Sequence, residues 1–446
     1  PLLPRPPRRM GWVLAPVQWC LGSVLRRTTI EGSLSAVVLL CGGLVFSSAY
    51  WGGADFPALG GGALVLQVLG VAVLGLGGYI GLVLPLRPKL VLGSYGRWGL
   101  TEAPRAPEQS LRGDLRCRGR WFVDGEGRTL LLRGLNLSGA CKLPTDPDGA
   151  TYRSDGSFFT RTRDVSFVGR PFPLEEADEH LSRIRSWGLT FVRLLITWEA
   201  VEHAGPGQYD EEYLAYLLAV VRKCADHGIT VFIDPHQDVW SRWTGGDGAP
   251  AWTLEAVGFA LNKIDRAGAA VTHQVHGDPF PKMIWGLNYQ RLACATMFTL
   301  FWAGDDLAPA TRVLDPALGE EVSAQEFLQG HFIAAMRRVA QVVAGEKNVV
   351  GFDSLNEPSP GWVGRRASLT DWGMPFLQGH ILSPVESMFA GSGHPVYCDV
   401  YSEPFVFSRR DLVNPDGVSC WQEGKDCVWK ANGVWDEGVD CWQEGK

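Results

Sequence analysis

A carboxylic acid directly behind a short, mostly apolar run is the feature of the sequence best suited to chemistry. The run covers residues 349–355, and the triplet Asn356-Glu357-Pro358 follows it. Such a run predicts a buried parallel strand, and Pro358 cannot extend its ladder of hydrogen bonds. We therefore expect Glu357 where the strand opens into a loop, at the edge where parallel sheets collect their catalytic groups. A carboxylic acid beside an amide suits delivery of a proton to a leaving oxygen, next to a hydroxyl that Asn356 could hold.

The same triplet has a plainer interpretation, because Asn and Pro are common turn residues and a strand that ends in a turn would also contain them. Other apolar segments bear on the choice, since each predicted strand ends in polar groups. Those segments are residues 131–139, 190–196 and 229–234. Polar groups that converge from several strand ends favour a catalytic site over a single turn.

Two polar residues of these strands are candidates for the site. Arg193 lies inside an apolar strand, and a buried arginine is costly unless a carboxylate pairs with it. It therefore predicts an acid at the mouth of the sheet or, alternatively, an ion pair with a structural acid such as Asp234. His236 follows the third strand and is either part of a binding site or an imidazole of the core. No second histidine stands at metal-ligand spacing from His236, so we expect no metal and no other cofactor.

The composition excludes one class of partner and points to a compartment. The chain has 446 residues and a net charge of −7, which does not suggest a nucleic-acid-binding surface. Its 18 tryptophans are many, and their faces can stack on sugar rings, although tryptophan also fills cores. The 10 cysteines form no CxxC pair, so they resemble reduced core thiols. This favours a cytosolic catalytic part.

The amino-terminal part of the sequence predicts a membrane hairpin. Residues 34–54 and 56–86 carry no charge, and either run is long enough to cross a bilayer, which needs about 20 apolar residues. Basic residues flank both outer ends, so both ends are expected in the cytosol. A signal peptide fits poorly because the apolar region is long and doubled. The alternative is that this segment is an artefact of the gene model, and the protein is then cytosolic without an anchor.

Predicted strands alternate with predicted helices, which indicates parallel βαβ units and an α/β fold. The helices are expected at residues 174–187, 210–226, 288–303 and 326–344. Behind residue 358 the pattern thins to a helix at 383–390 and a candidate fifth strand at 395–400.

The chain divides into four parts by composition. They are a basic tail (1–33), a two-helix membrane segment (34–86), a polar linker (87–118) and a folded domain (119–446). The hexapeptide CWQEGK occurs in the last part at residues 420–425 and again at 441–446. Because no core-forming pattern surrounds it, we interpret it as a local duplication or an assembly artefact.

Four segments in order resemble glycoside hydrolase family 5, a clan of retaining glycosidases with a (β/α)₈ barrel. They are LRGLNLSG (132–139), FVRLLITWEAVE (191–202), DPHQDVWSR (234–242) and FDSLNEP (352–358). The third segment and the aromatic insertion behind it resemble the endoglycoceramidase-related branch, in particular its fungal glucosylceramidase and steryl-β-glucosidase group. The resemblance covers residues 121–358. It implies a TIM barrel, of which only about the first half is present, preceded by the membrane hairpin.

The resemblance also implies roles for single residues. Glu357 would be the general acid/base, and Asn356 would hold the sugar 2-hydroxyl. Arg193 would orient the nucleophile, His236 would line the glycone subsite, and Trp240 would shape the pocket. A retaining mechanism needs a second carboxylate about 5–5.5 Å from the first, which the family carries at the end of its seventh strand. No acid behind Glu357 follows an apolar strand in this sequence, so we expect the chain to lack its nucleophile and roughly the second half of the barrel.

The leading hypothesis is a retaining β-glycosidase that hydrolyses β-glucosides of membrane lipids, such as glucosylceramide or a steryl glucoside. Aromatic residues of the insertion support a lipid substrate, namely Trp285, Phe298, Phe301 and Trp302. One alternative is a glycosidase acting on soluble glucans or aryl glucosides. Another is a membrane-anchored, catalytically inactive barrel remnant that only binds glycolipid. We expect no protein partner and no nucleic acid.

Overall fold

The structure is a computed structural model of the 446-residue chain. It describes residues 114–149, 155–277, 279–364 and 378–436, all within the compact unit Ala103–Lys446. The predicted basic tail and membrane segment lie outside the described residues, and so does most of the predicted linker. Within the described part of the chain, no helix combines the length and the apolar character that a membrane span requires.

A small antiparallel sheet opens the described part of the chain. It contains β1 (Arg116–Arg118), β2 (Trp121–Val123) and β3 (Thr129–Leu130) in the order β1-β2-β3. The strands β2 and β3 pair antiparallel and form a hairpin. Asp124 holds its turn, because its carboxylate accepts hydrogen bonds from the backbone N–H of Arg128 at 2.9 Å and of Glu126 at 3.1 Å. The strand β1 was not predicted, and it precedes the expected start of the domain at residue 119.

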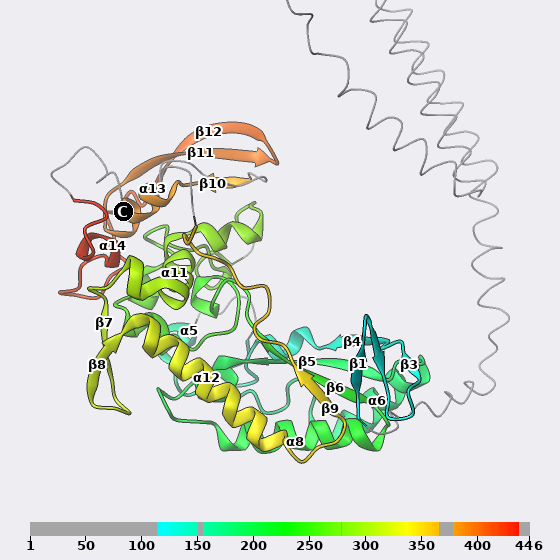
Figure 1. Cartoon of the computed structure of the whole chain (residues 1–446). Coiled ribbons are helices and arrows are strands. Elements are labelled where there is room, and N and C mark those ends of the chain that lie inside the picture. The colour runs from blue at the N-terminus through cyan, green and yellow to red at the C-terminus, as the bar shows by residue number, and fades with distance from the viewer. Residues whose placement is uncertain (1–113, 150–154, 278, 365–377, 437–446) are drawn as a thin grey trace, which may run out of the picture. The chain divides into compact units, whose positions relative to one another are not determined.

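A four-stranded parallel sheet is the centre of the fold (Figure 1). Its strands, in the order β4-β5-β6-β9, are β4 (Gly134–Leu137), β5 (Phe191–Thr197), β6 (Thr230–His236) and β9 (Val349–Phe352). The predicted α/β architecture with parallel βαβ units is therefore confirmed. Alternate residues of β5 and β6 are fully buried on one face, as the two-residue period of a strand requires.

Three long helices connect these strands and follow the sequence signals closely. They are α6 (Ala177–Ser186), α8 (Glu211–Asp226) and α12 (Ala324–Val343), and α8 contacts both of the others. Asp210 caps α8 by accepting a hydrogen bond from the N–H of Tyr213 at 2.9 Å. Behind it, Gly228 takes the positive φ of 63° that ends the helix. The apolar residues of α8 recur at helical spacing and face the sheet and the neighbouring helices.

A long insertion separates β6 from β9 and is mostly helical. Its main element is α11 (Leu292–Leu307), close to the helix predicted at 288–303. This helix is apolar nearly all round because α12 and α13 (Pro384–Gly391) both pack against it. Short elements complete the insertion: η4 (Arg242–Thr244), α9 (Ala251–Ala256), η5 (Leu261–Lys263), α10 (His273–His276), η6 (Trp285–Gln290), β7 (Arg312–Asp315) and β8 (Glu320–Ser323).

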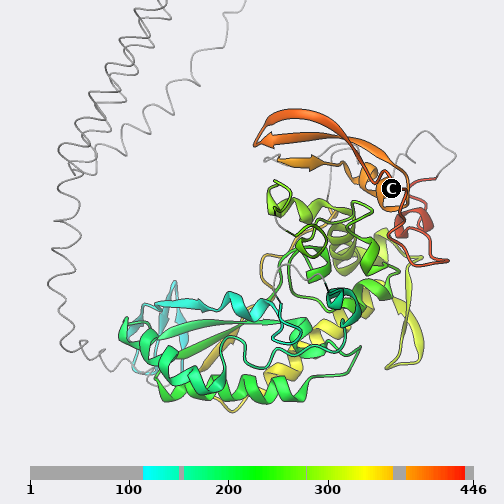
Figure 2. The ribbon, with the colours of Figure 1, turned by 180° about the vertical axis from the view of Figure 1, so that it is seen from behind.

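The carboxyl-terminal part forms a separate three-stranded sheet (Figure 1; Figure 2). The helix predicted at 383–390 is confirmed as α13, which Ser383 and Glu386 cap reciprocally. The strand predicted at 395–400 exists as β11 (Val396–Glu403), but it pairs antiparallel with β10 (Gly379–Ile381) and β12 (Val406–Val413). The interpretation as a fifth barrel strand is therefore wrong. The partner strand β12 begins only three residues after the end of β11, but its sequence VFSRRDLV forms no apolar run that would predict it.

The first copy of CWQEGK is part of the packed core. Cys420 and Trp421 are buried, and the Trp421 ring stacks on Phe259 with 4.3 Å between centroids. The side chain of Gln422 donates to the backbone carbonyls of Glu255 at 3.0 Å and Phe259 at 3.1 Å. The expectation that nothing core-forming surrounds this segment is wrong, because its partners belong to a distant stretch of the chain. The second copy lies outside the described residues.

A buried ion pair fixes the loops behind β5 and β6 to each other. Glu199 belongs to α7 (Trp198–Glu202), and its carboxylate receives Nε of Arg242 at 2.8 Å and Nη2 at 2.5 Å. Both side chains are buried, and the guanidinium also lies 4.5 Å from the Trp243 ring centroid. A bidentate geometry of this kind offsets the cost of removing both charges from water.

Arg242→Met should therefore lower the free energy of unfolding by about 3–5 kcal/mol, because it leaves Glu199 charged and unpaired in the core. The matched control is Arg338→Met. It breaks a bidentate pair with Glu211, which is mostly exposed, and should cost less than about 1 kcal/mol. Urea denaturation of the two variants compares the effects. Equal costs would show that the buried pair does not secure these loops.

Candidate active site

Arg193 joins three of the candidate strand ends. Its Nη2 lies 2.8 Å from Oδ1 of Asp234, 3.1 Å from Oδ2 of Asp353 and 3.0 Å from Oδ1 of Asn356. The arginine projects from β5, Asp234 lies in β6, and the other two residues follow β9. The pairing with Asp234 is the structural alternative that the sequence left open. The implied role of Arg193 in orienting a nucleophile stays a prediction.

His236 continues the same network on β6. Its Nδ1 lies 2.7 Å from Oδ2 of Asp234, and its Nε2 lies 3.3 Å from Oδ2 of Asp238 and 3.5 Å from Nδ2 of Asn356. Burial alone would lower the pKa of His236, but the hydrogen bonds to Asp234 and Asp238 outweigh burial and raise the pKa to about 9. At neutral pH the side chain is therefore an imidazolium between two carboxylates.

A lysine that sequence reasoning missed closes this network. Lys142 ends η2 (Gly139–Lys142), the turn directly behind β4, and it donates to Asp238. Burial would raise the pKa of Asp238, but hydrogen bonds with His236 and Lys142 hold it at about 2. Asp247 lies beside them. Its pKa is raised well above the ordinary value, mainly because the carboxyl group is buried and also because the charge of Asp238 is close. The position of Lys142 at a strand end was a usable signal, whereas nothing in the sequence marks Asp247.

The same cluster contains residue types that bind divalent cations. His236, Asp238 and Asp247 can each offer one ligand atom, and these atoms lie within 4.8 Å of one another. The spacing of histidines along the sequence could not reveal this group, because both further members are carboxylates. Lys142 contacts both acids, at 3.9 Å from Oδ2 of Asp247. The protein thus supplies its own positive charge, and we assign no metal to the cluster.

Asn356 and Glu357 lie in the loop behind β9, as predicted, but their environments differ. Asn356 is buried, and its backbone N–H donates to the carbonyl of Pro235 at 2.9 Å. Glu357 is exposed and has a positive φ of 40°. The arrangement offers a carboxyl group that solvent and substrate can reach, directly beside an amide whose orientation Arg193 fixes. Such a pair can exchange a proton and hold a hydroxyl.

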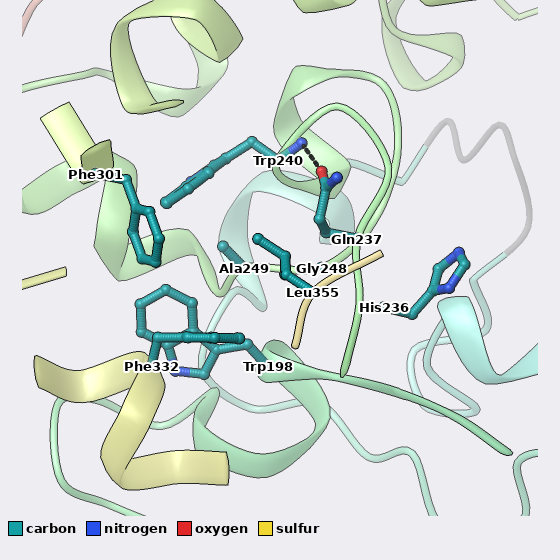
Figure 3. A pocket seen from close by; sticks show the side chains of 9 residues that line it. All are labelled: Trp198, His236, Gln237, Trp240, Gly248, Ala249, Phe301, Phe332 and Leu355. Carbon is teal, nitrogen blue, oxygen red and sulfur yellow. Dashed lines mark hydrogen bonds between the residues drawn. The ribbon is translucent and has the colours of Figure 1, made fainter. Parts of the chain in front are cut away.

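Trp240 lines a small, partly open pocket on the apolar side of this network (Figure 3). It is buried, and its indole N–H donates to Oγ1 of Thr253 at 3.1 Å. The cavity measures about 20 Å³, which is room for roughly one water molecule. Its lining is mainly apolar: Trp198, His236, Gln237, Trp240, Gly248, Ala249, Phe301, Phe332 and Leu355. Trp240 therefore shapes an aromatic cluster and does not present its face to solvent.

The aromatic residues expected to meet a lipid divide into two kinds. Phe298 and Phe301 belong to the core, with ring centroids 5.2 and 5.8 Å from Trp240. Trp285 and Trp302 keep 44% and 41% of their surface exposed. Composition alone cannot tell these two kinds apart, because the face that a helix turns outward depends on what packs against it.

The charge of His236 should make stability depend on pH. Because its pKa is about 9 in the folded chain and 6.5 in the reference state, the stabilisation is fully present below pH 6.5. It should be lost as the pH rises toward 9. Thermal unfolding at pH 6 and pH 9.5 should show a smaller fall in melting temperature for His236→Gln than for the unaltered chain. An identical fall in both proteins would show that the two carboxylates do not hold the proton on His236.

The part of the chain that contains these residues matches a known protein family. Residues 154–378 match the family model described as Cellulase (glycosyl hydrolase family 5). The matched range contains β5, β6 and β9 together with Arg193, His236 and Glu357.

Relatives and a solved structure agree with that match. A glucosylceramidase of Rhizopus delemar is 45% identical over 341 residues, which cover 74% of this chain and 49% of the relative. An ergosteryl-β-glucosidase of Saccharomyces cerevisiae is 33% identical over 362 residues, covering 71% and 47%. The crystal structure of Cryptococcus neoformans sterylglucosidase 1 superposes with a TM-score of 0.67 at 34% identity, covering 74% of this chain and 50% of that one.

The chain thus spans about half the length of the curated relatives it matches. The family model covers just over half of the sequence, and the fold superposes on that of the sterylglucosidase. The chain therefore belongs to glycosyl hydrolase family 5.

Proposed function

We propose that the protein is a retaining β-glucosidase that releases glucose from β-glucosides of membrane lipids, with a ceramide or a sterol as the aglycone. The observation that carries the proposal is the placement of Asn356 and Glu357 behind β9, where Arg193 holds the amide. The names of the relatives, a glucosylceramidase and an ergosteryl-β-glucosidase, support a glycolipid substrate.

Glu357 is the proposed general acid/base. It protonates the glycosidic oxygen as the bond to the aglycone breaks, and it later takes a proton from the water that releases the sugar. Asn356 is the proposed partner of the sugar 2-hydroxyl, since Arg193 fixes its Oδ1 and the backbone of Gln237 accepts its Nδ2 at 3.1 Å. A retaining reaction also needs a second carboxylate about 5–5.5 Å from the acid, and we assign that role to no residue of the described ranges.

His236 and Lys142 are proposed to line the glycone subsite with charge. A protonated His236 and the Lys142 ammonium both hold Asp238, so this carboxylate stays ionised and can accept hydrogen bonds from sugar hydroxyls. Trp240 contributes indirectly, because its ring supports the wall of the aromatic cluster beside His236.

The complete architecture is part of the proposal. We infer that β4, β5, β6 and β9 correspond to the first half of a (β/α)₈ barrel in a domain that begins near residue 119. The superposition on the sterylglucosidase structure supports this inference. A hairpin at residues 34–86 would attach this domain to a membrane and leave it on the cytosolic side, next to lipid substrates. The two uncharged runs and their basic flanks support it.

The role of Glu357 predicts a dependence on the leaving group. In the full-length protein, Glu357→Gln should lower kcat for glucosylceramide by about 10²- to 10⁴-fold, because this leaving group needs a proton. Aryl glucosides with acidic phenols need little protonation, so the first step of their hydrolysis should slow much less. Glu321→Gln, a change at an exposed residue of β8, is the control and should leave both rates unchanged. Equal losses of Glu357→Gln on both substrates would contradict the proton-donor role.

The proposed anchor predicts a topology. In sealed microsomes, added protease should digest the domain, and carbonate at high pH should leave the full-length protein in the membrane pellet. A variant that starts at residue 103 should appear in the supernatant, which controls for peripheral attachment of the domain. Protection from protease would reverse the topology, and release of the full-length protein by carbonate would exclude the anchor.

A further inference from the structure

The side-chain amide of Gln237 reaches two successive backbone carbonyls, those of Asn356 and Glu357. Its Nε2 lies 2.7 Å from the carbonyl oxygen of Asn356 and 3.0 Å from that of Glu357. An amide nitrogen has two protons, and these two carbonyls are its nearest acceptors, whereas Oη of Tyr289 lies farther away at 3.4 Å. Gln237 is buried, and a buried donor of this kind is costly to leave unpaired.

The contact is reciprocal between the two loops. The side chain of Asn356 donates through Nδ2 to the backbone carbonyl of Gln237 at 3.1 Å. The backbone N–H of Asn356 donates to the carbonyl of Pro235 at 2.9 Å. The end of β6 and the loop behind β9 therefore hold each other through side chains and backbone at once. A shift of either loop would break several of these hydrogen bonds together.

Both loops contain residues with a positive φ, either hydrogen-bonded to Gln237 or next to a residue that is. Glu357 has a φ of 40°, and Val239 and Trp240 have φ values of 45° and 78°. The backbone N–H of Trp240 donates to Oε1 of Gln237 at 2.9 Å. Residues other than glycine persist at positive φ only where the surrounding contacts determine them. The one amide of Gln237 supplies such contacts to both loops.

The space for Gln237 is itself tightly defined. Gly248 packs against it with a φ of 122°, and a Cβ at that position would lie 2.5 Å from the Cβ of Gln237. Figure 3 shows Gln237 between Trp240, to which its dashed hydrogen bond runs, and His236. The hydrogen bond from the Trp240 N–H holds Oε1 and so directs Nε2 toward the two carbonyls.

We propose that Gln237 is a positioning residue, whose amide sets the backbone of Glu357 and so aims its carboxyl group at the leaving oxygen. The inference rests on the proposed acid/base role of Glu357 and deepens it. Gln237 touches neither the substrate nor the reacting atoms, and it acts through the peptide of the acid. Loss of its two donors releases the strained turn, and the carboxyl group of Glu357 moves away from the line of proton transfer.

The test compares two glutamines of similar chemistry in the full-length protein. Gln237→Met keeps the length of the side chain and removes both donors, and Gln237→Glu places a carboxylate against two carbonyl oxygens. Gln422→Met is the matched control, because Gln422 also bridges two backbone carbonyls, those of Glu255 and Phe259, away from the site. Both Met variants should lower the melting temperature to a similar degree.

Only the Gln237 variants should change the chemistry. We expect kcat for glucosylceramide to fall by about 10- to 100-fold, since a small misplacement of a catalytic group can cost about 10²-fold. KM should stay nearly constant. The rate on an aryl glucoside with an acidic phenol should fall much less, and Gln422→Met should retain both rates. Equal losses of Gln237→Met on both substrates, or a loss that Gln422→Met reproduces, would overturn the proposal.

A double variant separates this inference from the proposed function. Gln237→Met should add little further loss to Glu357→Gln, because both changes remove the same proton transfer. An additive loss would contradict positioning through Glu357. If Glu357→Gln itself shows no dependence on the leaving group, the proposed function fails. If Glu357→Gln shows that dependence and folded Gln237→Met does not, only the positioning role fails. If Gln237→Met does not fold although Gln422→Met does, Gln237→Glu replaces it in the comparison. At low pH the new carboxyl group is protonated and supplies one hydrogen-bond donor.

Discussion

The buried carboxylate of Asp234 is the constraint on which the rest of the site depends. A carboxylate without exposure must be paired, and Asp234 uses Oδ1 for Arg193 and Oδ2 for His236. From there charges alternate outward through His236 to Asp238 and on to Lys142. This chain of ion pairs crosses β4, β5 and β6, and the contact between Arg193 and Asn356 adds β9. The strand ends are therefore held in register by charge as well as by the backbone ladder.

The residues around this charged chain stabilise it from two sides. On the apolar side, Trp198 and Trp240 pack edge to face in the aromatic cluster that lines the small pocket beside His236. On the loop side, the pair of Glu199 and Arg242 ties the segment behind β5 to the segment behind β6. Because each buried charge has a partner, the desolvation cost is offset locally. Asp234, His236 and Asp238 each have two charged partners, so removal of one of them weakens two ion pairs at once.

The sequence predicts those parts of the fold that local patterns determine. The helix α8 is predicted nearly to the residue, because Asp210 and Gly228 mark its ends and its apolar residues recur at one period. The convergence of Arg193, His236 and Asn356 is also predictable, since the carboxyl ends of parallel strands meet at one edge. Contacts between residues far apart in the sequence could not be predicted in this way. Asp247 joins the cluster from the insertion, and Trp421 reaches Phe259 from far along the chain, so no local pattern could reveal either contact. The antiparallel partners of β11 escaped prediction for another reason, because β10 has only three residues and β12 (VFSRRDLV) forms no apolar run.

The boundary between buried and exposed chain falls between Asn356 and Glu357, and the proposed reaction requires it there. An amide that holds a hydroxyl must keep one orientation, and burial with hydrogen bonds to Arg193 and Gln237 gives Asn356 that orientation. An acid that serves first as donor and then as base must meet both substrate and water. The positive φ of Glu357 turns the chain outward within one residue, and Pro358 cannot lead it back into the sheet. The buried amide and the exposed acid are thus neighbours in sequence, and the positive φ of Glu357 persists because the loop behind β6 holds its carbonyl.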